Sequence, residues 1–277
     1  MSQEATLTQQ SRVAVRKEAA GQFSRLQSAA LRAAGTVVFV LAWEGAVRSG
    51  IVDRLFLAPP SAIAETIWEL AGAGTLWTHI LETLRATLIG FAAGTLVGVL
   101  LGFALGLMPR IGALLSPFVT TMNSMPRIAL APLFVLWFGI GLTSRVVLVF
   151  SLVVFIVLTN TMAGTQSVDG DFLRLSRLLN AKRRDIILKV VLPSTVPWIF
   201  AAMRLSFAYA LAGAVVGEMF LGQRGLGYLI VAGSGVFNIS QIFAALVITV
   251  CIAYVLDSAA GLLERNLLKW RPKELAR

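Results

Sequence analysis

The sequence predicts an all-α polytopic membrane protein with about six transmembrane helices. The chain has 277 residues, of which 57% are hydrophobic and only 14% are charged, whereas a soluble domain carries about 25% charged residues. The mean hydropathy is +0.81. The apolar residues form several runs close to the length of about 20 residues that crosses a bilayer. This composition excludes an ordinary cytosolic enzyme, a disordered regulator and a disulfide-stabilised scaffold.

The apolar runs give six candidate spans, which we expect at residues 35–52, 84–108, 111–138, 146–163, 196–221 and 241–263. The first contains Glu44 and Arg48, and we expect the polar group of Glu44 to face another helix. The third is interrupted by Pro117, Pro126 and Pro132. Because proline removes a backbone donor and disturbs a helix, the third span is expected to be the least regular.

A short helix is expected on the outer surface between the first two spans. Ser61 is a candidate N-cap, and Ile63, Ile67 and Leu70 follow at helical spacing on one face. We therefore expect this helix to lie with its apolar face against the membrane or the protein.

The second span carries a glycine at every fourth position, at Gly90, Gly94, Gly98, Gly102 and Gly106. Small residues let another helix approach closely in a membrane. The stripe predicts that this helix is buried. It leaves open whether the contact lies within the chain or between subunits.

The distribution of basic residues predicts the orientation. Of the 24 Lys and Arg residues, 17 fall on four segments that share one side if the N-terminus is cytoplasmic. The predicted organisation is a basic cytoplasmic tail at 1–34, a transmembrane domain at 35–265 with a cytoplasmic loop at about 164–195, and a cytoplasmic tail at 266–277. The net charge of +10 therefore reflects topology and attraction to the inner leaflet, and no nucleic-acid partner is expected.

The sequence offers no catalytic constellation. Cys251 and His79 are the only cysteine and histidine, so neither a disulfide nor a zinc cluster can form within the chain. His79 is expected in an interfacial loop. No metalloprotease, nucleophile-elbow or P-loop motif is present. We expect no catalysis, no metal site and no cofactor bound by this chain.

The loop at 164–195 predicts a short amphipathic helix. Asp171 is a plausible N-cap, Phe172, Leu175 and Leu179 share one face, and Arg174 and Arg184 lie on the other. Such a helix can dock into a groove of a cytoplasmic partner. The alternative is a helix that rests on anionic lipid headgroups.

This loop resembles the cytoplasmic coupling motif of ABC-importer permeases, EAA-x3-G-x9-I-x-LP. When the motif is aligned on Leu192-Pro193, its glycine falls on Asn180, its Glu-Ala-Ala on 174–176 and its isoleucine on Val190. Arg174 and Asn180 depart from the motif, but Asn also tolerates the left-handed backbone that favours glycine. Pro193 is expected to end the coupling helices.

The resemblance extends over about residues 55–265, where the chain is similar to the permeases of the nitrate, sulfonate and taurine type. It rests on Phe56-Leu-Ala-Pro-Pro-Ser-Ala62, Thr83-Leu-Arg85, the run Met125 to Pro132, Trp137-Phe-Gly-Ile-Gly141, Met203-Arg204-Leu205, Glu218, and Arg224-Gly-Leu-Gly-Tyr228. It implies a type I ABC importer permease fold in the bacterial inner membrane, with both termini cytoplasmic.

The resemblance also implies partners. These are a second permease copy in a homodimer, two cytoplasmic ATP-binding subunits that hold ATP and Mg, an extracytoplasmic solute-binding protein, and membrane lipid. The implied function is the import of a small solute, such as a sulfonate, taurine or a nitrate-like anion. The residues it implies for ATPase coupling are Arg174, Leu175, Ser176, Asn180, Ala181, Arg184, Asp185, Leu192 and Pro193.

Polar residues within the spans are the candidates for the translocation path or gate. They are Asn123, Ser124, Met125 and Arg127, where prolines break the third span, together with Arg204 and Glu218. Irregular backbone at membrane depth is tolerated in protein or beside water, and Arg127 there could attract an anion. Glu218 could instead make a structural contact. It cannot pair with Arg204 on one straight helix, because the two lie about 21 Å apart along it.

Two other functions remain open from the residues alone. The first is a self-sufficient secondary carrier or channel for a small solute. The second is a membrane-embedded enzyme or assembly factor, which the absence of a catalytic cluster disfavours. A requirement for ATP and a partner subunit separates the importer from the carrier.

Overall fold

The computed structural model describes residues 30–267, and this part of the chain consists of helices joined by turns and loops, with no strand. Residues 1–29 and 268–277, which hold most of the two expected cytoplasmic tails, lie outside the described residues. The chain divides into two compact units, Met1–Glu65 and Thr66–Arg277.

In the first unit, the helix Ala30–Arg48 is joined to the start of α2 (Pro60–Gly72) by a polar contact. The Glu44 carboxylate accepts hydrogen bonds from the Ser61 N–H at 3.0 Å and from the Ser61 hydroxyl at 2.7 Å. Arg48 pairs with the same carboxylate at 2.5 Å. The expectation that Glu44 faces another helix is confirmed. Ser61 lies inside the first turn of α2, so the prediction that it is the N-cap is wrong.

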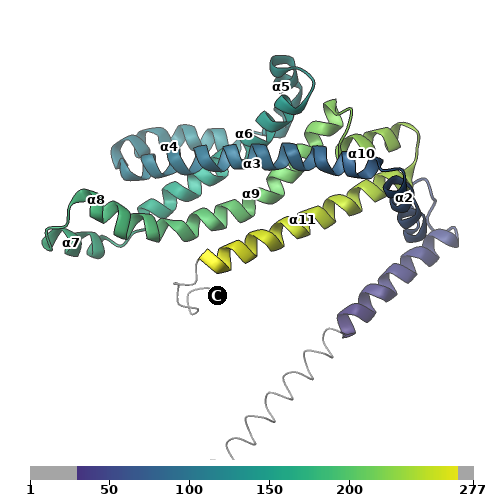
Figure 1. Ribbon diagram of the computed structural model, residues 1–277, viewed down its shortest axis with the longest axis horizontal. Helices are drawn as coiled ribbons and strands as arrows, with labels where there is room; N and C mark the ends of the chain where they lie inside the picture. The colour runs from purple at the N-terminus through teal and green to yellow at the C-terminus, as the bar shows by residue number, and fades with distance from the viewer. Residues whose placement is uncertain (1–29, 268–277) are drawn as a thin grey trace, which may run out of the picture. The chain divides into compact units, whose positions relative to one another are not determined.

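The second unit contains the remaining helices (Figure 1). They are α3 (Thr75–Leu107), α4 (Pro109–Ser124), η1 (Arg127–Leu130), α5 (Ala131–Phe138), α6 (Leu142–Gln166), α7 (Gly170–Leu178), α8 (Arg183–Ile186), η2 (Ile187–Val191), α9 (Leu192–Leu221), α10 (Leu226–Gly235) and α11 (Ile239–Leu267). The core forms where α6 packs along both α3 and α9. Buried Ala86 and Phe91 of α3 meet Val149 and Val153 of α6 and Ala210 of α9 there.

Five helices of the described chain are long and apolar enough to cross a membrane. They correspond to the predicted first, second, fourth, fifth and sixth spans. The predicted third span is not one helix, because the chain leaves helical geometry between α4 and η1 at Met125 and Pro126. The apolar segment Arg127–Phe138 that follows is short. Of the three prolines noted in the sequence, Pro126 lies at this break, since proline cannot donate to the helix ladder, whereas Pro117 lies inside α4 and Pro132 in the first turn of α5.

Pro193 does not end a helix, contrary to the expectation. An apolar helical run extends from Arg183 to Phe220 and includes a five-residue π-helical turn at Ile187–Val191. Pro193 lies in the first turn of α9, directly after this turn. A π-helical turn widens the backbone locally, so the helix continues past a residue that would otherwise break it.

The glycine stripe of α3 packs within the chain against α6. All five glycines are buried. A Cβ atom at Gly98 would lie 2.7 Å from the carbonyl oxygen of Val154 and 2.8 Å from the Cβ of Val157. The other four glycines meet α6 in the same way. The burial predicted from the stripe is confirmed, and the contact left open is with α6.

Replacing Gly98 with alanine should therefore destabilise the fold. A single methyl group would force α3 and α6 apart, and overpacking of this kind costs about 1–3 kcal/mol. Gly261→Ala is the matched control, because a Cβ at Gly261 in α11 meets nothing within 4 Å. The midpoint of thermal unfolding in detergent should fall by several degrees for G98A alone. Equal midpoints for the two variants would contradict the close packing of α3 on α6.

Candidate functional site

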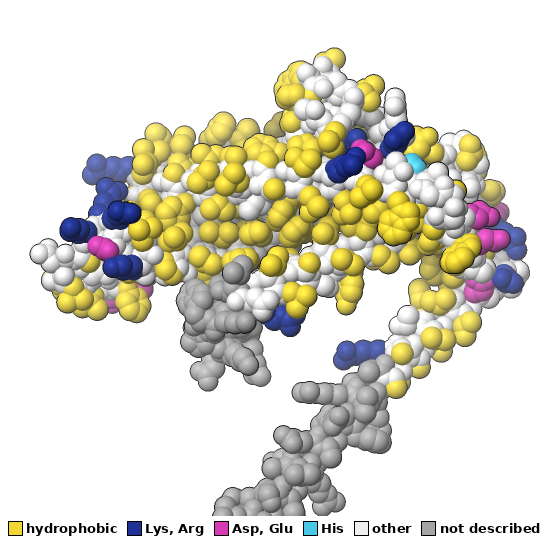
Figure 2. Space-filling model, in the orientation of Figure 1, with side chains coloured by type: hydrophobic (Ala, Val, Ile, Leu, Met, Phe, Trp, Pro, Cys, Tyr) yellow, Lys and Arg dark blue, Asp and Glu magenta, His cyan; other side chains and the backbone are white. Residues whose placement is uncertain are grey.

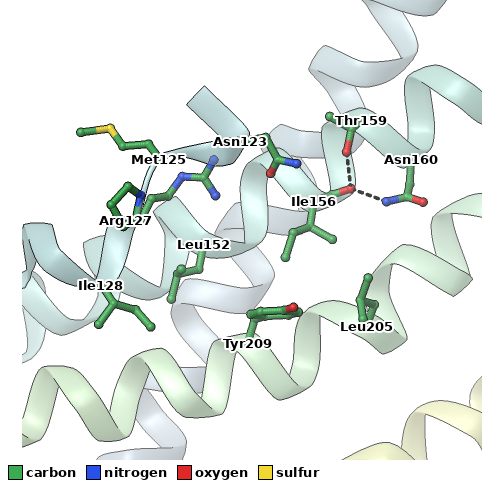
Figure 3. Close-up of a pocket in the computed structure, with 11 residues that line it drawn as sticks. Asn123, Met125, Arg127, Ile128, Leu152, Ile156, Thr159, Asn160, Leu205 and Tyr209 are labelled. Atoms are coloured by element: carbon green, nitrogen blue, oxygen red, sulfur yellow. Dashed lines mark hydrogen bonds between the residues drawn. The ribbon is translucent and has the colours of Figure 1, made fainter. Parts of the chain in front are cut away.

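A cavity of about 460 Å³ lies where the break after α4 meets the middle of α6 and α9. Figure 3 shows the side chains that surround it. Leu152, Ile156, Leu205 and Ile128 provide apolar walls. The polar lining comes from Asn123 and Arg127 on one side, Thr159 and Asn160 of α6, and Tyr209 of α9. The cavity can therefore receive a small molecule that has both a polar and an apolar part.

Arg127 is the charged residue of this cavity. It begins η1, directly after Pro126, and is only 7% exposed. Its guanidinium donates a hydrogen bond to the carbonyl oxygen of Met122 and lies 4.4 Å from the centre of the Phe155 ring. These two contacts hold the guanidinium in place at the edge of the cavity, where Figure 3 shows it extended toward Asn123.

Of the path candidates predicted from the sequence, Asn123, Met125 and Arg127 line this cavity. The Ser124 hydroxyl instead donates to the carbonyl oxygen of Thr120 in its own helix. Thr159, Asn160 and Tyr209 were missed. Thr159 and Asn160 both donate to the carbonyl oxygen of Ile156. A polar pair within the otherwise apolar run of α6 was the signal that could have found these two residues.

Glu218 lies away from the cavity, in a buried polar network that joins four helices. It is 1% exposed. Its carboxylate accepts hydrogen bonds from the Thr83 hydroxyl at 2.9 Å and from the Gly227 N–H at 3.0 Å. Arg145 of α6 lies 3.5 Å from it and also pairs with Glu82 at 3.3 Å. The arrangement satisfies a carboxylate that would otherwise be costly at membrane depth.

The same network fixes the start of α10. The Leu226 N–H donates to the Thr83 hydroxyl at 3.0 Å, and the Gly225 N–H donates to Nδ1 of His79 at 3.0 Å. The His79 ring also stacks on Tyr228, with ring centres 5.9 Å apart. His79 is a residue of α3, so its expected place in an interfacial loop is wrong. Three side chains thus receive the first backbone donors of α10, which would otherwise have no partners.

Arg204 does not meet Glu218, as expected from their separation. It binds Asp257 of α11 through two hydrogen bonds of 2.9 and 3.1 Å, and Glu264 lies 3.9 Å away. A smaller cavity of about 320 Å³ lies beside this ion pair, between α9 and α11. The two side chains of the pair are about half exposed. Arg204 therefore links α9 to α11 and lies outside the larger cavity.

The predicted amphipathic helix forms as α7, at the end of the second unit opposite α10 (Figure 1). Its apolar residues face outward, with Phe172 62%, Leu175 52% and Leu178 83% exposed. Lys182, Arg183 and Arg184 follow and are also exposed, and Figure 2 shows Lys and Arg side chains gathered at this end. The prediction that Asp171 is the N-cap is wrong by two residues. It is the carboxylate of Asp169 that accepts the N–H of Asp171.

Four of the nine predicted coupling residues lie in the turn between α7 and α8 or begin α9. Asn180 has a φ of +55°, the left-handed backbone that asparagine tolerates and glycine favours. Ala181 follows and donates its N–H to the carbonyl oxygen of Ser176 at 3.0 Å. Leu192 and Pro193 form the first turn of α9.

The other coupling residues lie on α7 and α8. Arg174 pairs with Asp171 at 3.6 Å, and Asp185 pairs with Lys189 at 2.9 Å. Leu175 and Arg184 are exposed, and the Ser176 hydroxyl donates to the carbonyl oxygen of Phe172.

Substituting Asn180 tests the left-handed turn. Glycine at this position should keep the turn, whereas valine should strain it, because a left-handed backbone costs about 1–2 kcal/mol in an ordinary residue. Hydrogen exchange of residues 170–186 should therefore accelerate in N180V and stay near wild type in N180G. Equal protection in the two variants would show that the backbone at Asn180 does not hold this turn.

Within residues 30–267, no group of three or more His, Cys, Asp or Glu side chains is placed to hold a metal ion. The polar groups described above bind one another, line the cavity or lie at the surface. The described chain therefore has a cavity with polar and apolar lining, a buried polar network and an exposed amphipathic helix.

Comparison with known proteins gives consistent relatives. Residues 94–269 match the family described as binding-protein-dependent transport system inner membrane component. The chain is 35% identical to the riboflavin transport system permease protein RibX of Chloroflexus aurantiacus, over 84% of this chain and 87% of that protein. It is 32% identical to the putative aliphatic sulfonates transport permease protein SsuC of Bacillus subtilis, over 84% and 85%. Identity to the taurine transport system permease protein TauC of Escherichia coli is 28%, over 85% and 88%.

Solved structures show the same fold. An inward-facing conformation of the MetNI methionine ABC transporter matches with a TM-score of 0.61 at 20% identity, over 69% of this chain and 95% of that chain. The crystal structure of an amino acid ABC transporter with histidines matches with a TM-score of 0.58 at 17% identity, over 73% and 97%.

Proposed function

The chain belongs to the family of binding-protein-dependent transport system inner membrane components, and on this premise we propose that it forms the membrane pathway of an ATP-driven importer for a small anion. The family makes it a multi-pass, non-catalytic permease subunit of an ABC importer in the inner membrane. The ATPase contact, the substrate class, the pairing of permeases and the orientation of the termini are parts of the proposal.

The exposed apolar face of α7 is the observation that carries the proposed ATPase contact. Phe172, Leu175 and Leu178 are each more than half exposed, and burying a large apolar side chain stabilises a complex by about 1.5–3 kcal/mol. Exposed cations follow directly at Lys182, Arg183 and Arg184. A partner with an apolar groove and an acidic rim would cover both features. This is the chemistry of a helix docked in a groove.

In the proposed complex, two cytoplasmic ATPase subunits hold ATP and Mg and receive α7 and α8 from two copies of this chain. A solute-binding protein delivers substrate to the opposite side. ATP-driven movement of the ATPases would shift the helices of the permease between two packed arrangements. With α7 and α8 cytoplasmic, both termini of the chain also lie on that side.

The proposed substrate class is a small anion. Two relatives are named as permeases for aliphatic sulfonates and taurine, and another as the nitrate import permease protein NrtB of Synechococcus elongatus. Sulfonate and nitrate groups both carry negative charge. The guanidinium of Arg127 at the cavity is the residue of this chain that suits such a charge.

Purification of the tagged chain from its native host in mild detergent tests the proposal, with intact mass of everything that stays bound. The expected result is two copies of this chain with two ATPase subunits. If a different permease chain is bound in place of the second copy, only the homodimer part of the proposal is wrong. A solitary chain that moves solute without ATP would contradict the importer and support a secondary carrier.

A further inference from the structure

Two arginines of the described chain are buried, and only one of them lies beside carboxylates. Arg127 and Arg145 are each 7% exposed. Arg145 lies 3.3 Å from Glu82 and 3.5 Å from Glu218. Arg127 forms no ion pair with any carboxylate in residues 30–267. Among residues 30–267, one buried cation thus has carboxylate counterions and the other has none.

The contacts of Arg127 orient its guanidinium without neutralising it. The Met122 carbonyl oxygen accepts one hydrogen bond, and the Phe155 ring lies 4.4 Å away. A cation over an aromatic face gains about 0.5–2 kcal/mol, whereas a buried charge without a partner costs several times more. A buried cation that is held in place but not paired is suited to an anion from outside the chain.

The cavity beside Arg127 has the lining that such an anion requires. Asn123 comes from the end of α4, Asn160 from α6 and Tyr209 from α9. Amide and phenol groups can donate hydrogen bonds to anionic oxygens. Leu152 and Leu205 leave apolar wall beside them. The polar groups come from three separate elements, so the site exists only when these elements are assembled.

The cavity lies near the middle of the two long helices that line it. Leu152 and Ile156 are near the middle of the 25-residue α6, and Leu205 and Tyr209 are near the middle of the 30-residue α9. An ionisable residue at such a depth usually marks a substrate or ion pathway.

We propose that Arg127 is the counterion of the transported anion, at a binding site inside the membrane domain where Asn123, Asn160 and Tyr209 complete the recognition. The inference rests on the proposed import function and adds to it. This permease selects its substrate by charge, in addition to any selection by a binding protein. The fitting ligand is a small monoanion, either a planar ion such as nitrate or a sulfonate with a short apolar body.

Direct binding to the purified complex tests the site. The probes are sodium nitrate, sodium ethanesulfonate and the uncharged ethyl methyl sulfone. Gluconate is the only other anion in the solution. Thermal unfolding at increasing probe concentration gives an apparent affinity for each. Wild type should bind at least one of the two anions and not the sulfone. Arg127→Gln should weaken anion binding about thirtyfold or more.

Three further variants keep the result interpretable. Arg127→Lys retains the charge and should bind better than the glutamine variant. Tyr209→Phe removes only a hydroxyl and should weaken binding about two- to tenfold. Arg110→Gln removes an exposed cation from α4 and should bind like wild type.

The proposal is overturned if neither anion binds wild type, if the sulfone binds equally well, or if R110Q and R127Q behave alike. It is also overturned if only added phosphatidylglycerol stabilises the protein through Arg127, since the site would then hold a lipid headgroup. If R127Q fails to fold, unchanged binding in Y209F overturns the proposed recognition. This binding measurement does not require the ATPase subunits. If no ATPase subunit is found bound to the purified chain, that result contradicts the proposed function and leaves the anion site to be judged by the binding data.

Discussion

Replacing Glu218 with alanine should be among the most destabilising single changes in this membrane domain. The side chain is completely buried, and its removal leaves Arg145 with Glu82 alone and the Gly227 N–H without its acceptor. Breaking a buried ion pair from one side costs about 3–5 kcal/mol. The midpoint of thermal unfolding in detergent should fall sharply, and hydrogen exchange at the start of α10 should accelerate.

Graded variants separate this explanation from a simple loss of volume. Glu218→Gln keeps the shape and an acceptor oxygen, so its midpoint should lie between those of wild type and E218A. Adding Arg145→Met to E218A should recover part of the loss, because it removes a buried cation that has kept only one of its two carboxylate partners, and Glu82 still has Arg85 at 3.1 Å. Glu69→Ala, at an exposed position of α2, should leave the midpoint unchanged. A wild-type midpoint in E218A would show that the network does not hold α10.

Changing the turn between α7 and α8 should separate ATP hydrolysis from uptake. Ala181 follows the left-handed Asn180 and is half-buried in the turn, so tryptophan there would displace the docking surface. Arg184 is exposed on α8, and glutamate would repel an acidic rim. Each variant should lose about tenfold or more of its uptake, A181W because the docking surface is displaced and R184E because like charges brought together in an interface cost several kcal/mol. ATP hydrolysis should continue without uptake, or the ATPase should dissociate.

The control is Arg224→Glu, which reverses an exposed cation in the turn before α10, at the opposite end of the second unit. It should leave the ATPase bound and hydrolysis coupled. All three proteins should remain inserted and unfold at similar temperatures. Coupled uptake in both A181W and R184E would remove the case for this segment as the ATPase contact.

Local patterns predicted the helices well. Hydrophobic runs located four long helices of the second unit, because burial and lipid exposure both demand apolar residues over a fixed length. The stripe from Gly90 to Gly106 predicted a close helix contact. It did not identify α6 as the neighbour, because small residues allow an approach without specifying which helix makes it.

Partners distant in sequence could not be predicted. The sequence indicated that Glu218 needs a polar contact and excluded Arg204, but Arg145 lies 73 residues away. Only the packing of α6 between α3 and α9 brings that arginine near. His79 was misplaced for a different reason, because α3 begins at Thr75, before the expected start of the second span at residue 84; its contact with Gly225, 146 residues away, could not be predicted either.

The candidate site was predicted in part. The broken third span and its arginine pointed to one wall of the cavity, through Asn123, Met125 and Arg127. The facing wall depends on which sides of α6 and α9 turn inward, and a run of mixed apolar and polar residues does not fix that rotation. The roles of the coupling residues stay predictions, and the structure adds that the backbone of Asn180 is left-handed.

Parallel uptake measurements in proteoliposomes test the central claim most directly. One preparation contains this chain with its ATPase and binding protein, and the other contains this chain alone. Labelled ethanesulfonate and nitrate are the probes. The account predicts uptake of at least one anion in the complete preparation, only with ATP on the ATPase side, and none by the chain alone. Uptake by the chain alone, independent of ATP, would contradict the account and establish a self-sufficient carrier.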